Sequence, residues 1–253
     1  MQGSNQPVLR DIVLVGGGHS HVAVLKRFGM KPVPGVRLTL VCRDTHTPYS
    51  GMLPGYIAGH YGYDDVHIDL RRLCEFAGAR FYRAEANDID REQQRVQCLG
   101  RPDVPYDLLS INIGSTPQLQ QVAGAADHAV PVKPINRFDH RWQALLERVR
   151  QHPGRTRIAV VGAGAGGVEL TLAMQYRLRR ELAAQDRDPD ELELDLFNAG
   201  AHILPTHNDR VRAVSERMLE RARRRSVHTD AAVEQVRRAR PARPPTATSV
   251  RRR

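Results

Sequence analysis

The stretch RIAVVGAGAGG, residues 157–167, decides the fold of this chain. Its apolar half is typical of a strand covered on both faces in a parallel sheet. Residues 168–182 then have helical periodicity, and Leu192–Phe197 (LELDLF) is typical of the next strand. The order strand, glycine loop, helix, strand predicts a βαβ unit. The glycines of the loop have the spacing G-x-G-x-x-G, with one glycine added: Gly162, Gly164, Gly166 and Gly167.

Each glycine of such a loop has its own physical reason. The first allows a tight turn, the second lets the backbone approach a pyrophosphate, and the third lets helix and strand pack closely. Backbone N–H groups and the helix dipole then face the anion. The complete copy at Gly162 predicts a dinucleotide site, while a glycine turn without a ligand stays open as the alternative.

A less regular copy, VGGGHSHVAV, occupies residues 15–24. It follows the apolar run at 11–15 and precedes a helical stretch to about residue 28 and a strand at 36–42. Gly16 and Gly18 keep the spacing, but His21 stands where the third glycine is expected. Either the helix stands off the strand or the imidazole points toward the ligand, and packing is the commoner role. Spacing alone leaves a dinucleotide site and an ordinary turn equally open.

The rest of the chain fills in around these two units, which begin about 146 residues apart. We expect further strands at 79–84, 94–99 and 108–113, with a hairpin turn at 90–93. Helices are expected at 70–76, at 138–149 and from Asp209 to about residue 225, followed by a short strand within 227–236. The break QHPG at 151–154 predicts a domain boundary, and the Arg/Pro-rich residues 237–253 are expected to be disordered.

Composition excludes several classes of protein. No apolar run approaches the roughly 20 residues of a membrane span, and the first ten residues lack the apolar core of a signal peptide, so a cytoplasmic protein is expected. The three cysteines form no C-x-x-C pair, which argues against a dithiol or thiolate metal site. Of the net charge of +10, residues 221–253 carry +9. A body near neutrality argues against nucleic acid as the partner, although an RNA-binding tail stays an alternative.

Neither unit has the carboxylate that usually follows the second strand and binds a ribose hydroxyl. At the first unit the position is Cys42, followed by Arg43, and at the second it is near Asn198. An amide can still bind a hydroxyl, but the sequence does not choose between NAD and NADP.

Three further motifs make the chain similar to a known family. YDLLSINIGSTP (106–117) resembles a strand ending in an A-T-G-S-type turn, with Asn112-Ile113 departing from the usual Ala-Thr. VGAGAGGVEL (161–170) resembles an NAD(P)H loop, including Glu169. GGGHSHV together with HTPYSGMLPGYIAGHY (46–61) resembles a type II NADH dehydrogenase-like subgroup, also found fused ahead of selenide, water dikinase. The chain therefore resembles the FAD-dependent pyridine nucleotide-disulphide oxidoreductase superfamily.

The resemblance implies a Rossmann-like α/β flavoprotein fold with two dinucleotide sites. It implies an N-terminal FAD-binding domain at 1–153 and a partial NAD(P)H-binding domain at 154–236. It also implies that FAD and NAD(P)H are the cofactors, with no side chain as catalyst or metal ligand. The residues implied in FAD binding are Gly16, Gly18, His19, Ser20, His21, Arg43, Pro48, Tyr49, Ser50, Gly51, Met52, Gly114, Ser115 and Thr116. Those implied in NAD(P)H binding are Gly162, Gly164, Gly166, Gly167, Glu169 and Asn198.

The implied activity is hydride transfer from NAD(P)H to flavin, with electrons passing to a quinone or another small acceptor. The resemblance is expected to stop near residue 236, because the tail looks like an out-of-frame reading of GC-rich DNA. We therefore expect a fold incomplete at its C-terminus, with peripheral membrane contact and the oligomeric state left open. A catalytically silent, nucleotide-binding remnant is the alternative.

Overall fold

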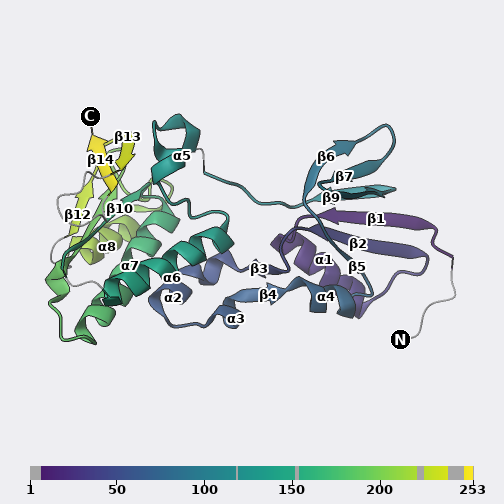
Figure 1. Cartoon of the computed structure of the whole chain (residues 1–253), viewed down its shortest axis with the longest axis horizontal. Helices are drawn as coiled ribbons and strands as arrows, with labels where there is room; N and C mark the ends of the chain where they lie inside the picture. Colours follow the sequence, from purple (N-terminus) through teal and green to yellow (C-terminus); the bar gives the residue numbers. More distant parts are fainter. Residues whose placement is uncertain (1–6, 118, 152–153, 221–224, 239–247, 253) are drawn as a thin grey trace. The chain divides into compact units, whose positions relative to one another are not determined.

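The structure is a computed structural model that describes residues 7–117, 119–151, 154–220, 225–238 and 248–252. Its contacts divide the chain into two compact units (Figure 1). The first comprises Met1–Ser50 and Tyr63–Ser115, and the second comprises Gly51–Gly62 and Thr116–Arg253. The sequence predicts the boundary between the two nucleotide-binding domains near residue 153. The packing instead groups residues 51–62 and 116–151 with the second glycine loop.

The first unit is built on a four-stranded parallel sheet in the order β5-β2-β1-β9. Its strands are β1 (Arg10–Val15), β2 (Val36–Cys42), β5 (Arg80–Arg83) and β9 (Leu108–Ile111). Helices α1 (His19–Met30) and α4 (Leu70–Phe76) cover one face, where Leu14, Leu25 and Leu40 are buried. The expected first βαβ unit is therefore β1-α1-β2, and β1 is covered on both faces as its apolar run predicts.

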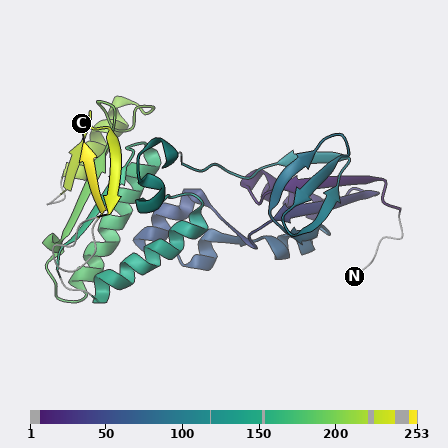
Figure 2. The ribbon, with the colours of Figure 1, turned by 45° about the horizontal axis from the view of Figure 1, so that its top comes forward.

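An antiparallel sheet of three strands covers the other face of this parallel sheet (Figure 2). It consists of β6 (Ala86–Asp90), β7 (Arg95–Cys98) and β8 (Arg101–Pro105). The expected turn does form a hairpin, but β7 pairs with β6 rather than with the strand at 80–83. Sequence patterns missed β6 and β8 because both are mostly polar. Three short elements complete the unit: β3 (His46–Pro48), α3 (Tyr63–Val66) and β4 (His67–Asp69).

The second unit contains a three-stranded parallel sheet in the order β10-β11-β12. Its strands are β10 (Thr156–Val161), β11 (Leu192–Phe197) and β12 (Arg225–His228), with helices α7 (Ala165–Ala183) and α8 (Asp209–Glu220). The unit β10-α7-β11 is the βαβ unit predicted from the opening stretch. The prediction that β10 is covered on both faces is wrong, because Val161 is 57% exposed while Ile158 and Val160 pack against helices on the other face. Among the described residues β10 is an edge strand paired only with β11.

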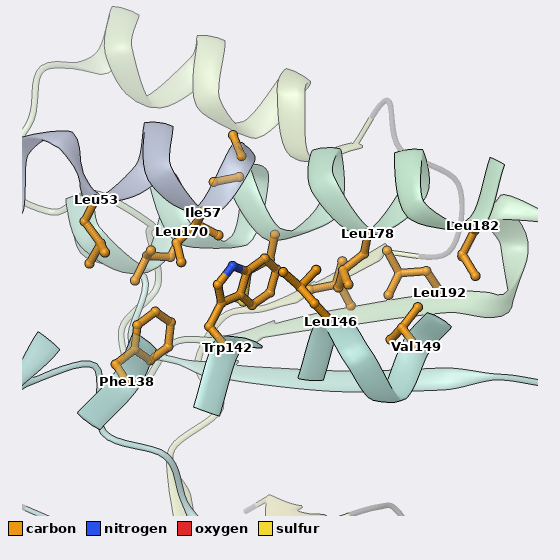
Figure 3. Packing of buried hydrophobic residues seen from close by; sticks show 14 of the residues in the cluster. Leu53, Ile57, Phe138, Trp142, Leu146, Val149, Leu170, Leu178, Leu182 and Leu192 are labelled. Atoms are coloured by element: carbon orange, nitrogen blue, oxygen red, sulfur yellow. The ribbon is translucent and has the colours of Figure 1, made fainter. Parts of the chain in front are cut away.

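The core of the second unit lies between α7, α6 (Ile135–Gln151) and the short helix α2 (Leu53–Ala58). Figure 3 shows the Trp142 ring surrounded by aliphatic side chains of these helices. Trp142 is 3% exposed, and Ile57 and Leu178 are fully buried. Residues 53–58 thus belong to this core although they lie between two segments of the first unit.

The remaining elements of the second unit are short. They are η2 (Leu119–Gln121), α5 (Ala125–His128), η3 (Pro189–Glu191), β13 (Val233–Arg238) and β14 (Thr248–Arg252). The short helix η1 (Ser50–Met52) has its first residue in the first unit and the other two in the second. β13 and β14 pair antiparallel (Figure 2), and the register places Val236 opposite Val250. This pairing differs from the disorder expected after residue 236, since a β-ladder uses main-chain groups that every non-proline residue carries. Residues 239–247 and 253 lie outside the described residues.

Candidate nucleotide-binding loops

The second glycine loop joins β10 to α7 by a tight turn. Gly162 has φ +102° and donates its N–H to Phe197 O at 2.8 Å, which holds the turn against β11. A Cβ at Gly167 would lie 1.8 Å from Gly162 O, so only glycine lets the helix start this close to the strand. Gly162 and Gly167 therefore carry the turning and packing roles expected of the first and third glycines.

The same loop is open on its outer side. A Cβ built at Gly164 or at Gly166 would meet nothing within 4 Å. Within the described residues, no acceptor bonds to the N–H groups of Ala165 and Gly166, and the first turn of α7 has no acidic residue. Free N–H groups at a helix N-terminus, with room in front of them, form an anion-binding site.

Asn198 follows β11, where a carboxylate is usual, and supports the loop beside the glycines. Its Nδ2 donates to Gly200 O at 2.8 Å and to His202 O at 2.9 Å. Leu204 N–H donates to Ala163 O at 2.8 Å, which ties this loop to the glycine turn. With Nδ2 used in this way, Oδ1 is the atom of Asn198 that can accept a bond from a ribose hydroxyl. Glu169 is exposed on α7, two residues after Gly167.

The first glycine loop is built differently around the same kind of turn. Gly16 has φ +92° and donates its N–H to Val41 O at 2.8 Å, and Gly18 donates to Asn112 O at 3.1 Å. A side chain at Gly16 would collide with the main chain of Asn112. The loop is therefore held between β2 and the residue that follows β9.

His21 occupies the third glycine position as a buried side chain. It is 1% exposed, and its Nδ1 lies 2.6 Å from Gly16 O while its Nε2 lies 2.9 Å from Ser110 Oγ on β9. Because a carbonyl oxygen only accepts, Nδ1 carries the proton and donates it to Gly16. Both nitrogens are bonded within the protein. The structure therefore gives His21 the packing role and does not turn its ring toward the outer side of the loop.

Gly18 shows a second difference between the two loops. A side chain there would collide with the carboxamide of Asn112, whereas Gly164 faces open space. Among the described residues no hydrogen bond reaches that carboxamide. At the start of α1, the N–H groups of His19 and Ser20 have no acceptor among the residues that the structure describes. The first loop thus retains free N–H donors, with a protein amide beside them.

Several other residues predicted for the first site lie close to this loop. The His19 ring is 5.0 Å from the Tyr49 ring, and its Nε2 lies 3.3 Å from Pro48 O, so these three residues come together. Arg43 pairs with Asp44 at 3.2 Å and with Glu85 at 3.6 Å. The hydrogen bond to Asp44 raises the pKa of the Arg43 guanidinium. This arginine is engaged by carboxylates at the end of β2.

Six other residues predicted for the first site belong to different units. Ser50, Gly114 and Ser115 belong to the first unit, whereas Gly51, Met52 and Thr116 belong to the second. Gly114 has φ +82° and open space around it, as expected at a turn. For these six residues, cofactor contact stays a prediction.

Sequence patterns missed Ser110 and did not give Asn112 a role in the loop. These two residues are the polar members of the otherwise apolar run LLSINI, residues 108–113. A polar residue inside a strand that pairs with β1 needs a partner, and Ser110 finds it in His21. That polar interruption is the signal from which the pair could have been found.

Comparisons with known proteins agree with this geometry. A family model described as pyridine nucleotide-disulphide oxidoreductase matches residues 10–248. The resemblance therefore extends 12 residues beyond position 236, where it was expected to stop. The predicted fold class, an α/β Rossmann-like flavoprotein fold, is confirmed by this match and by solved structures of that fold.

Individual relatives are distant and longer. The NADH dehydrogenase-like protein YutJ of Bacillus subtilis is 26% identical over 217 residues, covering 84% of this chain and 55% of that protein. The type II NADH:quinone oxidoreductase of Haemophilus influenzae is 25% identical, covering 78% and 52%. The structure of NDH2 from Plasmodium falciparum with NADH has a TM-score of 0.78 at 19% identity, covering 90% and 49%. The chain spans about half the length of these relatives.

Proposed function

Since the chain belongs to the pyridine nucleotide-disulphide oxidoreductase family, we propose that it binds NAD(P)H at the second glycine loop and FAD at the first. The activity proposed is that of an NADH dehydrogenase-like oxidoreductase, which passes a hydride from NAD(P)H to flavin and electrons to a quinone or another small acceptor. When bound, FAD supplies the redox chemistry, and the chain's own groups bind and orient the coenzymes. A cytoplasmic location and a small-molecule partner belong to the same proposal.

The observation that carries the proposal is the open space at Gly164, in front of the free N–H groups of Ala165 and Gly166. Only at the base of the loop, at Gly167, does a side chain meet main chain. A glycine loop that packs closely against the protein at Gly167 and faces open space at Gly164 can hold a diphosphate at the N-terminus of α7. The relatives named for NADH support a nicotinamide coenzyme as the source of that diphosphate.

The cysteines support an acceptor other than a disulphide. Burial raises the pKa of all three thiols, and that of Cys74 rises to about 12. Thiolate is the nucleophile in disulphide exchange, so these side chains are poor candidates for that chemistry. Among the described residues, no helix has the length and apolar content needed to cross a bilayer.

One observation favours a second candidate, a nucleotide-binding protein without redox activity. The carboxamide of Asn112 lies against Gly18, where a pyrophosphate would approach the first loop. If the amide stays there, FAD does not bind and only the second loop is used. The chain would then bind NAD(P)H and transfer no hydride.

Absorption spectroscopy of the purified protein, as isolated and after incubation with FAD, separates the two candidates. Flavin bands that bleach on addition of NADH support the oxidoreductase. NADH binding without any uptake of FAD supports the second candidate and refutes the first.

The variant Gly164→Val tests NADH binding at the second loop, and FAD uptake by the same variant is the control. Valine fits the extended backbone of Gly164 (φ −70°, ψ 178°), and its Cβ would meet nothing within 4 Å, but the side chain fills the space in front of the N–H groups. We expect NADH to bind about 100-fold more weakly, a loss of about 2.8 kcal/mol, with FAD uptake unchanged. NADH affinity equal to that of the wild type would show that the coenzyme does not bind at this loop.

A further inference from the structure

His21 and Gly167 occupy equivalent positions, each five residues after the first glycine of its loop. At the second loop the helix rests directly on the carbonyl of Gly162, because Gly167 has no side chain. At the first loop the equivalent carbonyl, that of Gly16, instead accepts a hydrogen bond from the His21 ring at 2.6 Å. The imidazole thus takes the place of direct contact between helix and strand.

The ring also reaches across to a third element. Its Nε2 lies 2.9 Å from Ser110 Oγ on β9, and β9 pairs with β1 at the strand end where the loop begins. In the tautomer whose Nδ1 donates to Gly16 O, Nε2 accepts a hydrogen bond from the Ser110 hydroxyl group. One buried side chain therefore connects the turn after β1, the first turn of α1 and the neighbouring strand.

The two residues before His21 supply the free N–H groups of this loop. His19 and Ser20 are exposed at the start of α1, and their N–H groups have no acceptor within the described residues. Their direction is set by the position of the first helical turn relative to β1 and β9. That position depends on the bonds of His21, since no third glycine is present to set it.

We propose that His21 is a positioning residue for diphosphate binding, and that the His21–Ser110 pair replaces the third glycine of the first loop. The pair holds the first turn of α1 so that the N–H groups of His19 and Ser20 converge on the anion. This inference rests on the proposed binding of FAD at the first loop.

The test measures FAD and NADH affinity in parallel, since the second loop of the same molecule serves as an internal control. We expect His21→Gly, which restores the G-x-G-x-x-G spacing, and Ser110→Ala to bind FAD about 10-fold more weakly, with NADH affinity unchanged. His21→Asn keeps a donor near the Nδ1 position, so it is expected to recover most of the affinity. Ser110→Thr keeps the hydroxyl and should resemble the wild type.

A spectroscopic measurement on the wild-type protein does not depend on how the variants fold. In ¹⁵N-labelled wild-type protein, NMR should show the His21 imidazole in the Nδ1–H form, because Nδ1 donates to Gly16 O. An Nε2–H form for His21 would overturn the proposal, as would His21→Gly binding FAD as tightly as the wild type. If the wild type takes up no FAD at all, the proposed function fails together with this inference. FAD uptake unaffected by these variants removes the inference alone.

Discussion

The start of α7 packs closely on the turn after β10, and this contact gives a specific prediction about Gly167. A Cβ at this position would lie 1.8 Å from Gly162 O, whereas real Cβ atoms essentially never come within 3.0 Å of another atom. Helix and turn must therefore separate by at least 1.2 Å, the difference between those two distances. The obstructing atom belongs to the main chain, which cannot rotate away. We place the cost of Gly167→Ala at about 3 kcal/mol, the upper part of the range for overpacked sites.

Gly166→Ala is the matched control, one residue earlier in the same helical turn. Its Cβ would meet nothing within 4 Å, and alanine is favoured over glycine in a helix by up to about 1 kcal/mol. The two variants should therefore differ by about 3–4 kcal/mol in unfolding free energy.

Fluorescence of Trp142, the only tryptophan of the chain, is a suitable probe because the ring is buried in the core of the second unit. Urea unfolding followed through this residue should show a lower midpoint for Gly167→Ala and an unchanged or higher one for Gly166→Ala. Equal midpoints for the two variants would refute the steric reasoning.

Three further predictions concern ionic side chains. Hydrogen bonds from Arg150 and Arg187 lower the pKa of Glu181 and Glu191, respectively, in the folded state. The two ion pairs therefore stabilise the fold fully above the unfolded pKa of glutamate, and this stabilisation is lost as pH falls through the lower folded pKa. Urea midpoints should therefore be constant near neutrality and fall below about pH 4, and a midpoint that rises on acidification would contradict this. Arg187→Met removes a largely buried guanidinium that bonds Glu191 and two main-chain carbonyls. Calorimetry should show a loss of about 2–4 kcal/mol in unfolding free energy, and a loss under about 1 kcal/mol would show that these bonds are dispensable. Asp69 accepts hydrogen bonds from the Arg71 side chain and from the N–H groups of Arg71 and Arg72 in the first turn of α4, which lower its pKa to about 2. A carboxyl resonance titrating near pH 4 in NMR would disprove that arrangement.

The sequence predicted those parts of the fold that repeat a periodic pattern. The runs at 11–15 and 157–161 became β1 and β10, the helix at 70–76 matches α4, and the fold class was confirmed. Apolar periodicity indicates where an element is, because it reflects a face that must be buried. It failed for β6 and β8, whose pairing rests on main-chain hydrogen bonds between mostly polar segments.

Long-range pairing could not be read from local patterns. Residues 53–58 look like part of the first unit by sequence position, yet Leu53 and Ile57 pack against α6 and α7. Local spacing likewise leaves the role of His21 open between packing and ligand contact. Its resolution required the distance to Ser110, a residue 89 positions away. Local spacing predicted both glycine loops, whereas the residues that hold the first one come from a distant strand.

The placement of α2 has a consequence for how the polypeptide acquires its structure during synthesis. Leu53 and Ile57 emerge from the ribosome roughly 80 to 120 residues before the side chains of α6 and α7 that bury them. Until then this short apolar segment has no partner from its own unit, and transiently exposed apolar surface of this kind promotes aggregation. Cutting the chain after residue 115 would separate the segment from the helices that bury it and remove part of the core of the second unit.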